Sequence, residues 1–235
     1  MRATDIAASH GCLIALSIAI GFDRGVVRNS VVLIDAAGPI PGIRVSGPRF
    51  GEFTSTFDKV HLSENNSADP GVHEKYHFAP GDGFVLWETK IGRIAPLVCY
   101  DRSFPESWRT VADAGAEVVV VPIATSRPER VRMLEAELSV AAMHNGVFVL
   151  AACKAGIEVW DGQAVTYSGG SMAIGPDGVV IARAATSDGN QVLRVVLDPE
   201  AIKGYPGTFH YARDRQPSAY ATRGNTRIEQ PYRRE

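Results

Sequence analysis

The sequence predicts an α/β protein with a mixed, covered sheet, and three observations support this fold class. Apolar, β-branched runs of strand length recur along the chain. Two helix signals separate the runs in the middle of the chain. Turn residues join neighbouring runs near both ends, which predicts hairpins there. Strands that alternate with helices form covered sheets, and hairpins add antiparallel strands to them.

The expected strands are apolar almost throughout, which is typical of strands that are buried on both faces. They span residues Leu13–Ile20, Val31–Ile34, Phe84–Trp87, Ile94–Val98, Val118–Pro122, Val147–Ala151, Ser171–Ile174, Val179–Ala182 and Val192–Val196.

Two helices have clear start and stop signals. The first is expected to begin at Pro105, where a missing N–H is harmless, and to end at Gly115. The second is expected from Pro128 to Gly146, with apolar residues at positions 131, 134, 138, 141 and 142 on one face. A tight turn is expected in "GPDGVV", residues Gly175–Val180.

The apolar stretch Gly11–Phe22 bears a faint likeness to the core of a signal peptide. It is too short to span a bilayer and no A-x-A cleavage signal follows it. Arg2 is balanced by Asp5, so the positively charged leader is poor as well. We interpret the stretch as a buried strand.

Size and composition restrict the class of protein. The 235 residues, 45% of them hydrophobic, are expected to form one domain, 1–235, with a C-terminal tail at about 205–235. A formal charge of −2 gives no basic footprint for nucleic acid. The three cysteines are far apart and form no CxxC pair, so neither a disulfide framework nor a cysteine-based zinc site is expected. A cytoplasmic setting is the simplest interpretation.

The stretch "LVCYDRSFPESWR", residues Leu97–Arg109, places Cys99 where a strand ends and a helix follows. In α/β sheets this is where functional sites gather. A nearby helix N-terminus favours a thiolate, and backbone N–H groups after the cysteine suit an oxyanion. The alternative is a buried structural thiol, since free cysteine is among the most buried residue types.

Charged residues near this junction have two interpretations each. Arg102 offers a planar fork to a substrate carboxylate, or it pairs with Asp101 or Glu106 on a solvated loop. Lys59 lies in the strand-like stretch Thr56–Leu62, where a lysine costs desolvation free energy unless a partner compensates. The alternative for Lys59 is an ordinary solvated side chain.

Five motifs in succession resemble the nitrilase, or carbon–nitrogen hydrolase, superfamily. They are "DKVHL", "HEKYHFAPGDGF", "IGRIAPLVCYDRSFPESWR", "GAEVVVVPIATS" and "GGSMAIGPDGVVIA", and the resemblance covers about residues 5–220. It implies a four-layer α-β-β-α sandwich that commonly pairs into dimers. It also implies a Glu–Lys–Cys triad that cleaves amides, carbamoyl groups or nitriles through a thioester or thioimidate, without a cofactor.

The resemblance also assigns roles to residues. Cys99 is the nucleophile, the Lys59 ammonium group stabilises the oxyanion, and the backbone N–H of Tyr100 completes the oxyanion hole. Glu74 matches an additional glutamate of amidase-like members, which holds the lysine and orients the scissile nitrogen. Without the family pattern, we would interpret Glu74 as a charged surface residue beside Lys75.

The glutamate that serves this family as general base has no match in the chain. The acidic residues ahead of the lysine strand are Asp5, Asp23, Asp35 and Glu52, and none has the expected "PE" strand-end context. Glu52 is not expected to replace the base, since the family register puts it beside the lysine strand. The resemblance therefore implies a chain that lacks the first strand, the first helix and the base-bearing strand.

Two consequences are expected from this loss. The missing proton acceptor costs about 10²–10⁴-fold in rate. The sheet that loses neighbours exposes edges and apolar surface, so poor solubility is expected.

Three segments resemble the N-carbamoyl-amino-acid amidohydrolase branch: "CYDRSFPESWR", "AACKAG" and "DRQPSAY". In that branch an arginine beside the nucleophile binds the substrate carboxylate, and Arg102 occupies this place. Ser103 replaces the branch's second arginine. The expected substrate is a small amide or N-carbamoyl compound that bears a carboxylate. Nitriles and simple aliphatic amides are the alternative, and a homodimer or higher homo-oligomer is expected.

Other interpretations remain open. His61, His73 and His77 lie near Glu74, but proline and glycine bracket the last two, so no metal site is expected. An unrelated hydrolase with a Cys–His pair would use His144. A non-catalytic remnant that serves as a partner for a complete homologue is the third alternative.

Overall fold

The computed structural model describes residues 2–22, 25–65, 72–126, 128–185, 191–204 and 211–220. The helices are α1 (Ala3–His10), α2 (Glu74–His77), η2 (Cys99–Ser103, a 3₁₀ helix), α3 (Pro105–Asp113), α4 (Pro128–Asn145), α5 (Glu200–Gly204) and α6 (Pro217–Tyr220). The strands are β1 (Ile14–Gly21), β2 (Val27–Asp35), β3 (Gly38–Pro39), β4 (Gly42–Arg44), β5 (Phe53–Thr54), β6 (Phe57–Asp58), β7 (Glu64–Asn65), β8 (Val72–His73), β9 (Val85–Thr89), β10 (Gly92–Pro96), β11 (Val118–Ile123), β12 (Phe148–Cys153), β13 (Ala155–Trp160), β14 (Gln163–Ser168), β15 (Met172–Ile174) and β16 (Val180–Arg183).

The larger sheet of the described chain is mixed, in the order β16-β15-β12-β11-β10-β9-β4-β5. Its three central strands, β10, β11 and β12, are parallel. The crossovers between them contain α3 and α4, because parallel strands need a long connection. The outer pairs are antiparallel, as the predicted hairpins require.

The smaller sheet consists of β1-β2-β3, with β6 paired to β2. Val31 of β2 and Phe57 of β6 belong to the same buried cluster as Trp87 and Val119 of the larger sheet. The two sheets therefore pack face to face and share one core. This places Lys59, the residue after β6, between the sheets.

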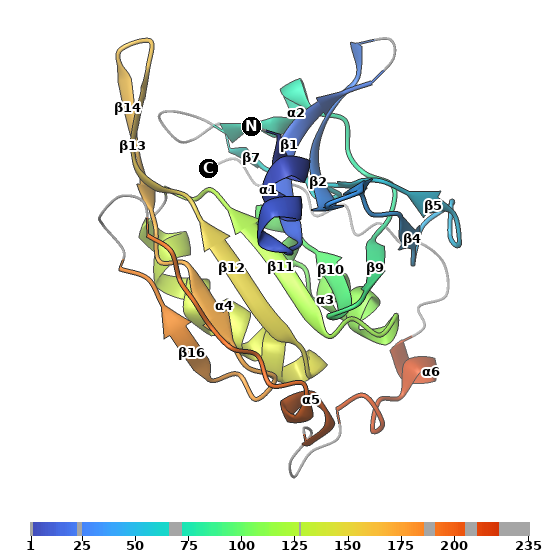
Figure 1. Ribbon diagram of the computed structural model, residues 1–235. Coiled ribbons are helices and arrows are strands. Elements are labelled where there is room, and N and C mark those ends of the chain that lie inside the picture. The colour runs from blue at the N-terminus through green and yellow to red at the C-terminus, as the bar shows by residue number, and fades with distance from the viewer. Residues whose placement is uncertain are drawn as a thin grey trace.

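Helices cover the outer faces. Trp108 of α3 and Leu138 of α4 join the shared core from the far side of the larger sheet, and α4 lies behind that sheet in Figure 1. Ala7 of α1 is buried, and α1 packs against β2. The order of layers confirms the predicted α-β-β-α sandwich.

The helix signals act as predicted. Pro105 opens α3, and Gly115, two residues after the helix, has φ 96°. Gly146 follows α4 with φ 62°, the left-handed conformation that ends many helices.

Two predictions about strands are wrong. The stretch 11–22 forms β1, but β1 is largely exposed rather than buried, because it is an outer strand with β2 as its one neighbour in the described chain. Residues Val192–Val196 form no strand, and both end residues are exposed because they pair with no sheet edge.

Helix α1 and the protruding β13–β14 hairpin were not predicted, although both are plain in Figure 1. Of the expected C-terminal tail, residues 205–210 and 221–235 lie outside the described residues. Among the described helices, none combines the length and apolar character that a membrane span requires.

Candidate active site

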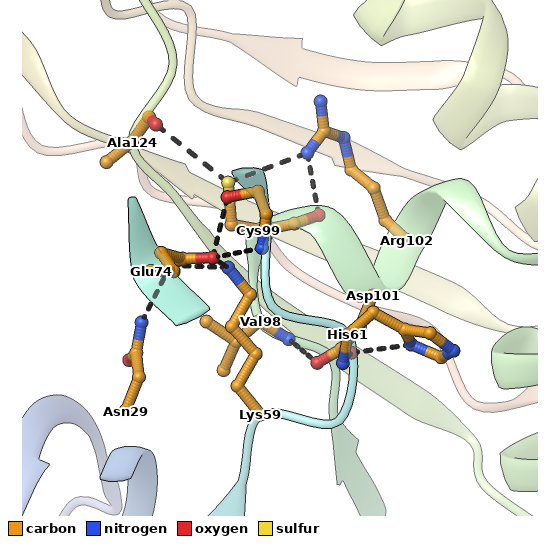
Figure 2. A network of polar contacts seen from close by, with 10 residues as sticks. Asn29, Lys59, His61, Glu74, Val98, Cys99, Asp101, Arg102 and Ala124 are labelled. Carbon is orange, nitrogen blue, oxygen red and sulfur yellow. Dashed lines mark hydrogen bonds and ion pairs between the residues drawn. The ribbon is translucent and has the colours of Figure 1, made fainter. Parts of the chain in front are cut away.

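Cys99 lies three residues after the end of β10, at the first position of η2. Its φ of 47° places it in the left-handed region, which costs an L-residue about 1–2 kcal/mol and marks functional sites. The thiol sulfur lies 3.8 Å from the carbonyl oxygen of Ala124 and 3.8 Å from a guanidinium nitrogen of Arg102. Figure 2 shows both contacts around the sulfur.

Asp101 ties the cysteine turn to the segment that carries Lys59. Its fully buried carboxylate accepts hydrogen bonds from the backbone N–H of Val98 (3.1 Å) and of His61 (2.8 Å). The same carboxylate lies 2.9 Å from Nδ1 of His61, whose ring stacks on Phe104 with centroids 3.7 Å apart. Two segments 40 residues apart in the sequence are thereby joined beside the thiol.

Lys59 is 1% exposed and its ammonium group is paired with Glu74. Nζ donates to the two carboxylate oxygens at 2.6 and 2.5 Å. The backbone N–H and the hydroxyl of Ser63 donate to Glu74 at 2.6 Å each, and the amide of Asn29 lies 3.4 Å away. In Figure 2 the Lys59 and Glu74 side chains point toward one another beneath Cys99. A lysine buried in this way meets the desolvation cost with a charged partner.

The environment of Glu74 favours its ionised form. Burial alone raises the pKa of this carboxyl group, but the hydrogen bonds from Lys59 and Ser63 outweigh burial and lower the pKa below 4.5. A carboxylate held by these donors is a weak proton acceptor. Glu74 is therefore suited to orient Lys59 and a substrate nitrogen rather than to act as the general base.

Arg102 contacts both the cysteine and an acidic residue of α4. One guanidinium nitrogen donates to the carbonyl oxygen of Cys99 at 2.6 Å, and Nε donates to Glu137 at 3.1 Å. The Arg102 side chain is 2% exposed. Arg130 also pairs with Glu137, at 3.0 Å. The two partners expected for Arg102 were Asp101 and Glu106, and neither of them pairs with it. The role of Arg102 in binding a substrate carboxylate stays a prediction.

Cys153 is a second thiol near the site, at the end of β12. Burial raises its pKa to about 11, the positive charge of Arg102 opposes the rise, and Cys99 adds to it. A thiol with this pKa remains protonated and unreactive at neutral pH.

The competing interpretations find little support in the geometry. His144 is exposed on α4, where its ring lies 5.0 Å from that of Tyr211, and it is absent from the thiol contacts described above. Glu52 is exposed beside β5, at the edge of the larger sheet, whereas Lys59 follows a strand of the smaller one. In the described part of the chain, no three His, Cys, Asp or Glu side chains gather as metal ligands would.

The structure thus brings Lys59 to Glu74 and Arg102 to Cys99, and joins the two pairs through Asp101 and His61. Tyr100 follows the thiol and is 37% exposed. Sequence reasoning missed the functional contacts of Ser63, Asp101 and Glu137. A signal for Glu137 was present, because it is an acidic residue next to Leu138 on the apolar face of a helix.

Comparisons with known proteins show the family of the chain. The Carbon-nitrogen hydrolase family profile matches residues 2–206, and the chain belongs to this family. A citrullinase from Francisella tularensis is 29% identical over 84% of this chain and 65% of that protein. An N-carbamoylputrescine amidase from Solanum lycopersicum is 31% identical over 82% of this chain and 62% of that protein.

A solved structure shares the fold. It is a mutant of the amidase from Nesterenkonia sp. AN1 with the acetamide moiety of fluoroacetamide covalently added at the active-site cysteine. The TM-score is 0.68 at 25% identity, over 92% of this chain and 70% of that one. The present chain spans less than two thirds of the length of the two curated relatives.

Proposed function

We propose that this chain cleaves a carbon–nitrogen bond of a small N-carbamoyl compound or amide, with Cys99 as the nucleophile. The observation that carries the proposal is the buried Lys59–Glu74 pair on the segment that Asp101 joins to the cysteine turn. In such a site an ammonium group stabilises the oxyanion that forms when a thiolate attacks a carbonyl.

The proposed reaction has two stages. The Cys99 sulfur attacks the carbamoyl or amide carbon, and Lys59 and the Tyr100 N–H stabilise the oxyanion until the C–N bond breaks. The thiol proton passes to the leaving nitrogen, so that an amine or ammonia departs and a thioester remains on Cys99. Water then hydrolyses the thioester and regenerates the thiol. Glu74, ionised and fixed by Ser63, keeps Lys59 in place through both stages.

N-carbamoyl compounds are the substrate class that we favour. The two curated relatives above are named for citrulline and N-carbamoylputrescine, and both molecules carry a carbamoyl group on nitrogen. The expectation of a carboxylate on the substrate rests on Arg102 alone.

The proposed site has no general base assigned among the described residues. Among the described residues, no carboxylate or imidazole is hydrogen-bonded to the Cys99 sulfur, and Glu74 is engaged by donors. We therefore expect the 235-residue chain to be acylated faster than it turns over, and its rate to lie about 10²–10⁴-fold below that of a site with a base. A non-catalytic binding role is the second candidate, and this same observation favours it.

Intact-mass analysis tests both candidates. Incubation with N-carbamoyl amino acids, N-carbamoylputrescine or simple amides is expected to add one acyl or carbamoyl group to the chain, whereas a nitrile is expected to add its whole mass as a thioimidate. Peptide mapping should place that group on Cys99, while Cys153 stays unmodified at neutral pH because of its raised pKa. The Cys99→Ala variant should show no adduct. If no substrate class gives an adduct on the wild-type chain, the binding role is favoured instead.

A further inference from the structure

We propose that Arg102 is a positioning residue, held by Glu137, that clamps the Cys99 backbone and so fixes the direction of the thiol. The inference rests on the proposed role of Cys99 as nucleophile and assigns to Arg102 and Glu137 a task that differs from substrate binding. Three contacts carry it: the bond from Arg102 to the Cys99 carbonyl, the bond from Arg102 to Glu137, and the bond from Trp108 to the Arg102 carbonyl.

The backbone of Cys99 needs such a clamp. The residue has a positive φ of 47°, and it is not a glycine, so its conformation persists only where surrounding contacts hold it. The 2.6 Å bond from the Arg102 guanidinium fixes the Cys99 carbonyl, while the Asp101 N–H donates at 3.0 Å to the Val98 carbonyl and fixes the peptide group just before Cys99. The peptide groups on both sides of the thiol-bearing Cα are thereby restrained.

Arg102 is itself held at both ends. Nε1 of Trp108 donates to its backbone carbonyl at 2.7 Å, and Trp108 is 2% exposed. Glu137 accepts from Nε at 3.1 Å and is shared with Arg130, which also donates to the hydroxyl of Ser103. A guanidinium fixed in one rotamer by a carboxylate transmits that position to the group it binds.

The same contacts argue against a free fork for a substrate carboxylate. Two of the three guanidinium nitrogens of Arg102 are committed to protein acceptors, and the side chain is 2% exposed. The interaction with Glu137 also supplies the carboxylate that a substrate would otherwise bring. A positioning role makes the reactivity of Cys99 depend on Arg102 for every substrate, charged or neutral.

The test compares Arg102→Met and Glu137→Gln with a matched control, Glu135→Gln. Glu135 lies on the same helix and pairs with Arg183, but this pair is exposed. All variants carry Cys12→Ser, which removes an exposed thiol. Two quantities are measured: the second-order rate of Cys99 alkylation by iodoacetamide, and acylation by a neutral amide and by a carboxylate-bearing N-carbamoyl compound. Rates are referred to the folded fraction from circular dichroism.

The proposal predicts a lower rate of Cys99 alkylation for Arg102→Met, and a fall of about 10²-fold in acylation, since a small misplacement of a reacting atom in a bound complex has this cost. In the Glu137→Gln variant both rates should fall about tenfold, because the substitution weakens a charge-assisted hydrogen bond to Arg102. Acylation should fall by the same factor for neutral and carboxylate-bearing substrates, with binding unchanged, and Glu135→Gln should match the parent.

Two results would overturn the proposal. Unchanged alkylation, together with a loss confined to carboxylate-bearing substrates, would make Arg102 a substrate-binding residue. Unchanged alkylation with a lower unfolding temperature would make the Arg102–Glu137 pair merely structural. The alkylation arm needs no substrate, so it decides the positioning role even if the proposed hydrolysis is absent.

Discussion

At the scale of single residues, the site depends on charges removed from water. Lys59 is almost fully buried, and Glu74 is the carboxylate that makes its burial tolerable. Asp101 is fully buried as well, and it is satisfied by two backbone N–H groups and a histidine. Each of these buried charges is therefore tolerated only together with the partners that the fold packs around it.

Replacing Glu74 by Gln is expected to lower the free energy of unfolding by about 3 kcal/mol at pH 7, because a buried ammonium group loses its counter-charge. The folded-state pKa of Glu74 is lowered below the ordinary value of 4.5, so the ionised carboxylate stabilises the fold at any pH above 4.5. This contribution disappears as the pH falls through the lower folded-state value. Urea titrations between pH 7 and pH 3 measure the difference between wild type and variant, which should shrink at acidic pH.

The control for this prediction is Glu64→Gln. Glu64 pairs with Lys75 at 3.4 Å, but both side chains are exposed, so little change is expected. The role given to the Glu74 charge would be contradicted if the free energies of unfolding of the wild type and of Glu74→Gln differed by the same amount from pH 7 down to pH 3.

At the scale of elements, the position of Lys59 depends on a close backbone contact. The N–H of Gly81 donates to the Lys59 carbonyl at 2.7 Å, and the Lys59 N–H donates to the Asn29 carbonyl at 2.8 Å. A Cβ at Gly81 would lie 2.0 Å from the carbonyl oxygen of Asp58. The loop after α2 and the end of β6 therefore fit together only with glycine at this position.

The substitution Gly81→Ala is expected to cost about 2 kcal/mol of folding free energy, because the added methyl group collides with rigid backbone. It should also slow the acylation of Cys99, since the displaced backbone carries Lys59. Gly21→Ala is the control, because a Cβ there meets no atom within 4 Å. Equal effects of the two substitutions on unfolding and on the adduct rate would refute this account.

The elements that could be predicted are those with local signals. Pro105 and Pro128 open α3 and α4, and the apolar runs of the central strands match β9 to β12 within a few residues. Helix α1 lacks a start signal, because the residue at its N-cap is Arg2, although Gly11 ends it in the left-handed conformation. The β13–β14 hairpin was missed because its strands have exposed positions and no long apolar run.

At the scale of the whole molecule, four layers share one core, and one outer strand is left exposed. Leu16 and Ile18 of β1 are 37% and 44% exposed, although β1 is as apolar as a buried strand. An apolar outer strand presents unpaired backbone groups and an exposed hydrophobic surface to other molecules. The predicted poor solubility and the predicted self-association remain predictions, and this strand is a physical cause for the first.

A charge on β1 is expected to reduce aggregation. Ile18→Lys should raise the amount of the 235-residue chain that stays in solution after centrifugation, because an outward lysine disfavours edge-to-edge pairing. Circular dichroism should be unchanged. Val192→Lys serves as control, since Val192 is 85% exposed but lies outside both sheets. Equal gains from both variants would show that net charge, and not the outer strand, limits solubility.

The sequence by itself determined the fold class, the central strands and helices, and the residue types of the site: a cysteine at a strand end, a lysine in an apolar stretch and a glutamate after it. These depend on local patterns and on the order of motifs along the chain. Only the tertiary structure decided that Glu74, itself held by Ser63, pairs with Lys59 and that Asp101 joins two distant segments. It also decided that Arg102 pairs with Glu137. The physical reason is that the desolvation of a charge depends on which groups the fold packs around it, and no local pattern records those neighbours.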